Sequence, residues 1–138
     1  MKTNLLRTIL LLTSFALTAS LHAEPTLFGN KALAGQSLDA DGIKAVLLGK
    51  KITLGDTRVV IVIAKESAAQ DAFLQSHVGM TTSQFQNHWR RLFMTGGGSA
   101  PKVVENEAEA VKIAAETAGA VVVADPANAA SLAVLAAN

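Results

Sequence analysis

One segment rich in β-branched residues, TRVVIVIA at residues 57–64, constrains the fold of this chain more than any other segment. Its β-branched residues predict a strand, and the lack of alternation predicts that both faces of that strand are covered. A second run, AVVV at residues 120–123, predicts another buried strand. Helical patterns alternate with these runs, so the chain is expected to fold as an α/β layered sandwich.

Two helices are predicted in the first half of the chain. Ser37 is the expected N-cap of the first, which should end at Gly49. Ser67 is the expected N-cap of the second, which should run to about Val78. The stripe predicted to face the core on this second helix consists of Ala69, Ala72, Phe73 and Ser76.

Two more helices are predicted in the second half. The first begins at Thr81 or Thr82, and its apolar side chains recur at helical spacing as Phe85, Trp89, Leu92 and Phe93. The second is expected from Glu105 to Ala118, with Gly119 as its C-cap. Its predicted buried side chains are Ala108, Val111, Ala114 or Ala115, and Ala118. A short strand is expected at residues 26–29, and residues 132–135 are expected to form a strand or a short helix.

The first 23 residues are predicted to be a signal peptide. Lys2 and Arg7 give a basic start, the apolar run at 9–19 is too short to cross a bilayer, and Ala23 offers a cleavage site. The alternative is an uncleaved N-terminal anchor. Residues 24–138 are then expected to form one periplasmic domain, which contains no cysteine and so must be stable without disulfides.

Charge and composition argue against several partners of the mature chain. Lys2 and Arg7 are two of the 12 basic residues, which leaves ten basic against 11 acidic residues and a net charge of −1 with His neutral. The whole chain has one Trp, five Phe and no Tyr, which argues against a stacking surface for nucleic acid. No apolar run after residue 23 approaches the length of a membrane span.

Catalytic and metal-binding motifs are not recognisable. The Gly-rich stretch TGGGSAPK at 95–102 lacks the Gly-Lys-Ser/Thr ending of a Walker A motif and follows a predicted helix. His77 and His88 lie on different predicted helices without cysteine or clustered carboxylates, so no metal site is expected, and His88 is expected to be solvated. Arg90 and Arg91 are expected either to face water or to grip an anion. The chain is therefore predicted not to be an enzyme and to need no cofactor.

The order of motifs between Leu47 and Val123 resembles the second lobe of periplasmic phosphate-binding proteins, the soluble receptors of ABC transporters. The motifs are LLGKK, the Val/Ile-rich strand, a Glu-Ser helix start, HWRRLFMTGGGSAPK and AVKIAAETAGAVVV. The resemblance covers about residues 25–136 and implies one lobe of a type 2-like binding protein. A full receptor of that family closes two lobes on an anion, and this chain has room for about one.

The resemblance implies an anion site at the helix start capped by Ser67. Similar receptors hold phosphate there with Ser-Gly-Thr-Arg, whereas residues 67–70 read Ser-Ala-Ala-Gln, so only the serine matches. The unpaired N–H groups and dipole of a helix start independently favour a small oxyanion such as phosphate. The alternative is that Ser67 is only an N-cap. The candidate ligand-binding residues are Ser67 and Ala68, together with Thr95 and Gly96 of a turn that forms either a phosphate cradle or a flexible connection.

Three classes of function remain open from the sequence. The first is a periplasmic solute-binding or accessory module of the phosphate ABC-transporter type, with anion binding weak or lost because Gln70 replaces the cation and Glu66 adds negative charge. The second is an interaction domain, whose former cleft face meets a second copy as a homodimer or another periplasmic protein. The third is a small hydrolase whose site carries no motif.

Overall fold

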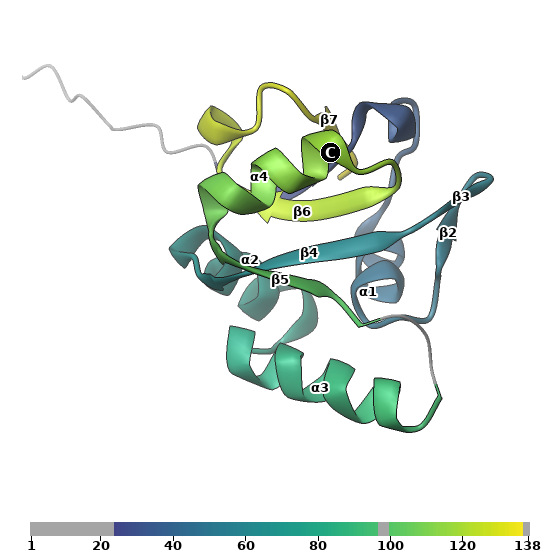
Figure 1. Cartoon of the computed structure of the whole chain (residues 1–138), viewed down its shortest axis with the longest axis vertical. Coiled ribbons are helices and arrows are strands. Elements are labelled where there is room, and N and C mark those ends of the chain that lie inside the picture. The colour runs from purple at the N-terminus through teal and green to yellow at the C-terminus, as the bar shows by residue number, and fades with distance from the viewer. Residues whose placement is uncertain (1–23, 97–99, 137–138) are drawn as a thin grey trace, which may run out of the picture.

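A five-stranded mixed sheet lies between two layers of helices in the computed structural model, which describes residues 24–96 and 100–136 (Figure 1). The predicted signal peptide lies outside the described residues. The strands are β1 (Thr26–Gly29), β4 (Val60–Glu66), β5 (Lys102–Asn106), β6 (Ala120–Ala124) and β7 (Ala133–Val134), in the spatial order β5-β4-β6-β1-β7. Strands β2 (Thr53–Leu54) and β3 (Thr57–Arg58) form a separate hairpin.

The sheet combines parallel and antiparallel pairs. Strand β4 pairs in parallel with both β5 and β6, so that Val62 lies between Lys102 and Val122. Strand β1 pairs antiparallel with β6 and β7. The parallel pairs are joined by crossover connections that contain helices, as parallel pairing requires. The predicted α/β layered sandwich is therefore confirmed.

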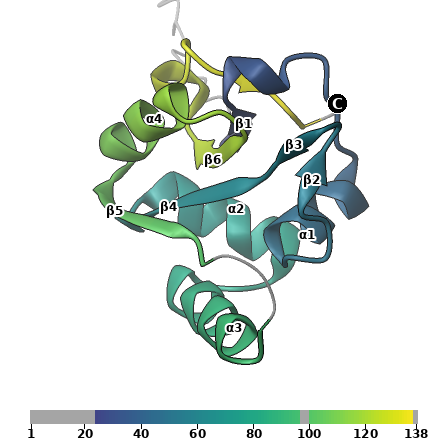
Figure 2. The same ribbon diagram turned by 45° about the vertical axis from the view of Figure 1, so that its right-hand side comes forward.

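Helices cover both faces of this sheet (Figure 2). They are α1 (Ala40–Leu47), α2 (Ala68–Val78), α3 (Thr82–Met94) and α4 (Glu107–Glu116), with short 3-10 turns at Lys31–Leu33 and Pro126–Asn128. One hydrophobic cluster joins the sheet to α1, α2 and α3, and a second joins the opposite face to α4. Each layer thus buries one face of the sheet.

The side chains of β4 and β6 explain why their apolar runs are continuous. Ile61 and Ile63 of β4 point into the cluster with α1 to α3, whereas Val62 belongs to the cluster with α4. In β6, Val121 and Val122 divide between the two clusters in the same way. Because both faces are packed, residues 61–64 of β4 and all of β6 are apolar, and only the exposed end of β4 carries charged residues.

Two of the four predicted helix starts are confirmed and two are wrong, one of them at α1. The Ser67 hydroxyl caps α2, and Thr81 caps α3 in a reciprocal capping box with Gln84. Helix α1 is capped by Asp39 instead of Ser37, because the Asp39 carboxylate accepts the Gly42 N–H at 2.7 Å. The predicted 57–64 strand is interrupted after β3 and resumes as β4.

The predicted buried faces of α2 and α3 need correction. On α2, Gln70, Phe73 and Leu74 are buried, so the face is rotated from the predicted stripe of Ala69, Ala72, Phe73 and Ser76. On α3, Phe85 and Trp89 are buried, but Phe93 in the last turn is 58% exposed. A small-residue helix such as α2 gives a weak periodic signal, which explains the first error.

The fourth predicted helix also differs from the structure. Helix α4 begins at Glu107 and not at Glu105, because residues 105 and 106 extend β5. Its buried side chains are Ala110, Val111 and Ala114, whereas the predicted Ala108 and Ala118 are exposed. Gly119 is not the C-cap, which is Thr117, although Gly119 has a positive φ of 80°. The ambiguous segment 132–135 contains the short strand β7.

Candidate functional site

Three helical N-termini meet at the carboxyl edge of the parallel strands. Strand β4 ends at Glu66 and leads into α2, β5 ends at Asn106 and leads into α4, and β6 ends at Ala124 and leads into the turn Pro126–Asn128. Helices α2 and α4 lie on opposite faces of the sheet, so the connections diverge at this edge. In open α/β sheets, ligands bind in the crevice at such a point. The sequence-predicted helix start therefore lies where this architecture places a ligand.

Ser67 occupies the centre of this edge and has two hydrogen-bond partners. Its hydroxyl oxygen accepts the Gln70 N–H at 3.1 Å, which is the ordinary N-cap bond. Its hydroxyl hydrogen donates to Oε1 of Glu107 at 3.4 Å. The hydroxyl that would donate to a bound anion is thus already directed at a carboxylate of the same chain.

Glu107 gathers donors from two sides of the edge. Besides the Ser67 hydroxyl, its Oε1 accepts the Asp125 N–H at 3.2 Å. Its Oε2 accepts the Asn128 side-chain amide at 2.5 Å. Asp125 in turn caps the 3-10 turn by accepting the Ala127 N–H at 2.9 Å. We call Ser67, Glu107, Asp125 and Asn128 the Glu107 cluster, in which a carboxylate receives the kind of donors that an oxyanion would need.

The cation nearest to the cluster along the chain is already paired. The ammonium group of Lys65 lies 2.8 Å from Oε1 of Glu105 on the neighbouring strand. This hydrogen bond and the charge of Glu105 raise the pKa of Lys65 above its ordinary value. Glu66 and Glu109 are exposed nearby, and Glu109 accepts the Glu105 N–H at 3.2 Å. The edge therefore carries mostly negative charge, which opposes the capture of another anion.

Gln70 is turned away from the edge and into the interior. Its side chain is 1% exposed, and its Oε1 accepts the Ala64 N–H while its Nε2 donates to the Ala64 carbonyl, both at 2.9 Å. Nε2 also lies 3.2 Å from the Thr82 hydroxyl, which donates to Asp71. Gln70 thus links β4, α2 and α3. The side chain of Gln70 is therefore fully used in hydrogen bonds within the core and does not face the edge.

The structure does not bring Thr95 and Gly96 to the Ser67 edge. Helix α3 begins beside Gln70 through Thr82 and runs 13 residues to Met94, a length of about 20 Å at 1.5 Å per residue. The Thr95 hydroxyl donates to the carbonyls of Arg91 and Leu92, at 3.1 and 3.0 Å. The C-terminal end of a helix carries partial negative charge, so this position disfavours an anion. The four candidate residues do not form one site.

Three members of the Glu107 cluster were not predicted from the sequence. The sequence alone places Glu107 only within the helix expected from Glu105 to Ala118, and it gives Asp125 and Asn128 no role. The available signal was topological, because the residue after each strand of a parallel group lies at the same edge. Listing the residues that follow β4, β5 and β6 gives Ser67, Glu107 and Asp125.

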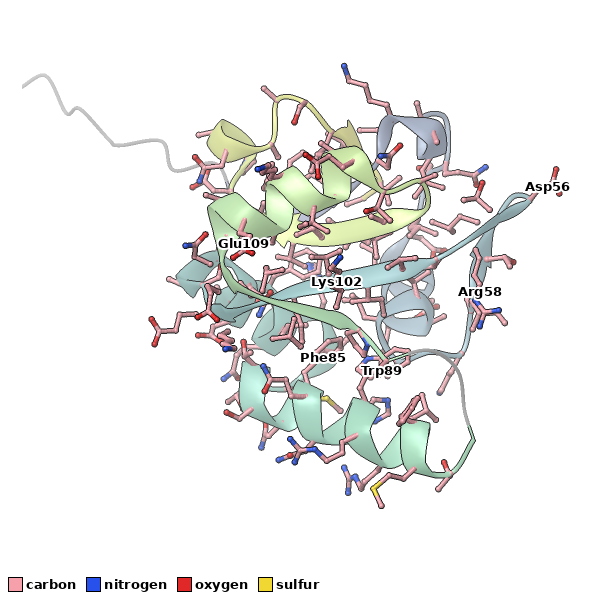
Figure 3. All side chains as sticks on the ribbon, viewed as in Figure 1. Asp56, Arg58, Phe85, Trp89, Lys102 and Glu109 are labelled. Carbon is pink, nitrogen blue, oxygen red and sulfur yellow. The ribbon has the colours of Figure 1, made fainter. Side chains whose placement is uncertain are left out.

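Two side chains of α3 hold the end of α1. The indole Nε1 of Trp89 donates to the Leu47 carbonyl at 2.9 Å, and Nε2 of His88 lies 3.1 Å from the Leu48 carbonyl. Trp89 is 5% exposed and packs edge-to-face against Phe85, with ring centroids 6.5 Å apart. Figure 3 shows the Phe85 and Trp89 rings directed from α3 toward the sheet. Trp89 thus lies in the core, as its place on the apolar stripe of the helix predicts, whereas His88, which is expected to be solvated, is half-buried against a carbonyl.

The rest of the described surface places limits on the site. Within residues 24–96 and 100–136, no three His, Asp or Glu side chains are grouped so that they could hold a metal ion. No helix in the same ranges is long and apolar enough to cross a bilayer. The exposed large apolar side chains of the described residues are Ile52, Phe93, Met94, Val103 and Val134. None of them belongs to the Glu107 cluster or its flanking residues, so this edge offers a polar surface to any partner.

No protein-family model matches the chain, and no curated protein matches it. The likeness to phosphate receptors therefore rests on the motifs quoted above.

Proposed function

We propose that the protein is an exported, non-enzymatic binding or accessory module, built like one lobe of a phosphate-binding protein but without phosphate capture at its helix start. The observation that supports this proposal is the Glu107 cluster. A carboxylate of the chain receives the Ser67 hydroxyl, the Asp125 N–H and the Asn128 amide at the edge where a solute would bind. The protein then acts through contact with another protein, such as a receptor, transporter or sensor component, and not as the carrier of the anion.

The cluster favours this function over that of a phosphate receptor for two reasons. A phosphate group at the α2 N-terminus would meet the charge of Glu107, and like charges at close range repel by several kcal/mol in a partly desolvated site. The side chain at position 70, which would have to supply the compensating cation, is a buried glutamine. An oxyanion would therefore have to displace Glu107 without a new cation to replace the lost hydrogen bonds.

A homodimer through the same edge is the second candidate partner arrangement. Small residues at this point, Ala68 and Ala69, permit close approach of another backbone, and two-fold dimers are the commonest oligomers. The edge exposes Glu66, Glu105 and Glu109, which would face their own copies across a two-fold axis. The polar character of the surface thus favours a different, basic partner over a second copy.

Replacing Glu107 with alanine should lower the free energy of unfolding by about 1–2 kcal/mol, because three donors lose a charged acceptor. Phosphate should then stabilise the Glu107→Ala protein, since a ligand that binds only the folded state raises its stability. Urea melts in phosphate and in sodium chloride of equal ionic strength measure both effects. The wild-type protein should show no phosphate-specific gain.

The matched control is Glu66→Ala, which removes one negative charge from the same edge. The Glu66 side chain is exposed and lies outside the cluster. If phosphate stabilises Glu66→Ala as much as Glu107→Ala, then net charge and not the filled position governs anion binding. A phosphate-specific gain in the wild-type protein would contradict the proposed function directly.

A further inference from the structure

A pocket of about 490 Å³ lies at the other end of β4, next to the hairpin formed by β2 and β3. Strand β4 runs from Val60 at this pocket to Glu66 at the Glu107 cluster, so the two regions lie at opposite edges of the sheet. Binding in the pocket is therefore independent of the function proposed above. Its volume falls within the range of about 300–1,000 Å³ that is typical of small-molecule sites.

Most of the side chains that line the pocket are apolar. Ile61 of β4, Trp89 and Leu92 of α3, and Ile52 before the hairpin all contribute to the lining. Trp89 and Ile61 are 5% and 7% exposed, and Trp89 is held by its bond to the Leu47 carbonyl, so both form a fixed base next to the more exposed Leu92 and Ile52. Ile52 is 50% exposed, although a large aliphatic side chain gains by burial. A ligand with a hydrocarbon or aromatic body would cover this surface.

The charged groups in the lining are all cations. Lys50, Lys51 and Arg58 contribute to the pocket, and no carboxylate is among its described lining residues. Figure 3 shows Arg58 on the hairpin and Trp89 on α3, from two different sides of this region. Within the described part of the chain, Lys50 and Lys51 form no ion pair. The positive charge of the two ammonium groups is therefore not neutralised by the protein.

The end of α1 does not cancel this positive charge. A helix C-terminus is partly negative because its last carbonyls lack partners. Here the Leu47 carbonyl accepts from Trp89, and the Leu48 carbonyl lies against His88. The Ala45 carbonyl accepts the N–H groups of both Lys50 and Lys51, at 2.9 and 3.0 Å. These carbonyls have donors, so the basic side chains Lys50, Lys51 and Arg58 determine the charge of the pocket lining.

We propose that this pocket binds a small amphiphilic anion, with its apolar body against Ile52 and Leu92, next to Trp89, and its carboxylate, sulfonate or phosphate head at Lys50 and Lys51. The lining combines apolar side chains with cations, and an amphiphilic anion carries the complementary groups, an apolar body and a negative head. A purely inorganic anion would leave the exposed Ile52 side chain uncovered. A neutral apolar ligand would gain no electrostatic attraction from Lys50 and Lys51.

Anilinonaphthalene sulfonate is a suitable probe for the full protein, and phenylnaphthylamine is its neutral counterpart without the sulfonate. Trp89 is the single tryptophan in the chain and lines the pocket, so energy transfer from it reports where the probe binds. We expect one bound sulfonate probe per chain, quenching of Trp89 emission, and an affinity about tenfold or more above that of phenylnaphthylamine. Higher salt should weaken only the sulfonate probe.

The double variant Lys50→Glu/Lys51→Glu should reduce sulfonate affinity about tenfold or more and leave phenylnaphthylamine nearly unaffected. The control is Lys112→Glu, an exposed charge reversal on α4 at the other face of the sheet. Urea melts show whether each variant is folded, and Lys51→Ala replaces the double variant if that protein does not fold. Equal affinity for the two probes, unchanged Trp89 emission, or an equal loss in Lys112→Glu would overturn the proposal.

Discussion

Replacement of Trp89 with alanine should lower the free energy of unfolding by about 3–5 kcal/mol, which is the usual loss for a large buried aromatic side chain. The ring is 5% exposed, contacts Phe85 edge-to-face, and donates its N–H to the Leu47 carbonyl at 2.9 Å. The alanine variant would leave a cavity between α3 and the sheet and an unpaired carbonyl at the end of α1. Urea melts of the purified protein give the loss directly.

Phe93→Ala is the matched control on the same helix. Phe93 lies one turn after Trp89 and is 58% exposed, so its loss should change stability by less than about 1 kcal/mol. A loss below about 1 kcal/mol for Trp89→Ala as well would show that the Trp89 ring is not buried. Comparable large losses in both variants would mean that the last turn of α3 is packed more tightly than the structure shows.

Gly119→Ala should destabilise the protein by about 2–5 kcal/mol, the sum of the penalty for a left-handed residue and that for overpacking. Gly119 has φ of 80°, and a Cβ atom there would lie 2.1 Å from the backbone oxygen of Arg58. Its own carbonyl accepts the Val60 N–H at 2.9 Å, so this turn is fixed against the start of β4. The clash is with backbone and cannot be relieved by a change of side-chain rotamer. Urea melts of the variant give the loss in stability.

Gly35→Ala separates the two contributions. Gly35 has a similar φ of 92°, but a Cβ atom there would meet nothing within 4 Å. Its substitution should therefore carry only the conformational penalty, about 1–2 kcal/mol. If Gly35→Ala and Gly119→Ala destabilise equally, then the contact between Gly119 and Arg58 does not constrain the fold.

The parts of the fold that the sequence predicted well are those with strong local signals. The apolar runs around Ile61 and Val122 could only be strands in a sheet covered on both faces, and the structure has them there. The caps at Ser67 and Thr81 follow from side-chain chemistry within three residues. Both kinds of signal depend only on residues that are close in the sequence, so they can be recognised before the tertiary structure is known.

The parts that could not be predicted depend on contacts between distant residues. Gln70 is polar and was expected to mark a lost ligand cation, but its burial depends on the backbone groups of Ala64 and on Thr82. The partners of Glu107 come from two separate segments, at Ser67 and at Asp125–Asn128, and their convergence follows only from the strand order. Periodicity was also weak in α4, where alanine is common on every side of the helix.

The most direct test of the central claim, that Glu107 occupies the anion position at the start of α2, is a calorimetric titration of the wild-type protein with phosphate. We expect no measurable heat of specific binding, which corresponds to a dissociation constant weaker than about 1 mM or −4 kcal/mol. Sulfate should behave in the same way. A micromolar dissociation constant, about −8 kcal/mol, would contradict the claim and identify Ser67 as a donor to a bound anion.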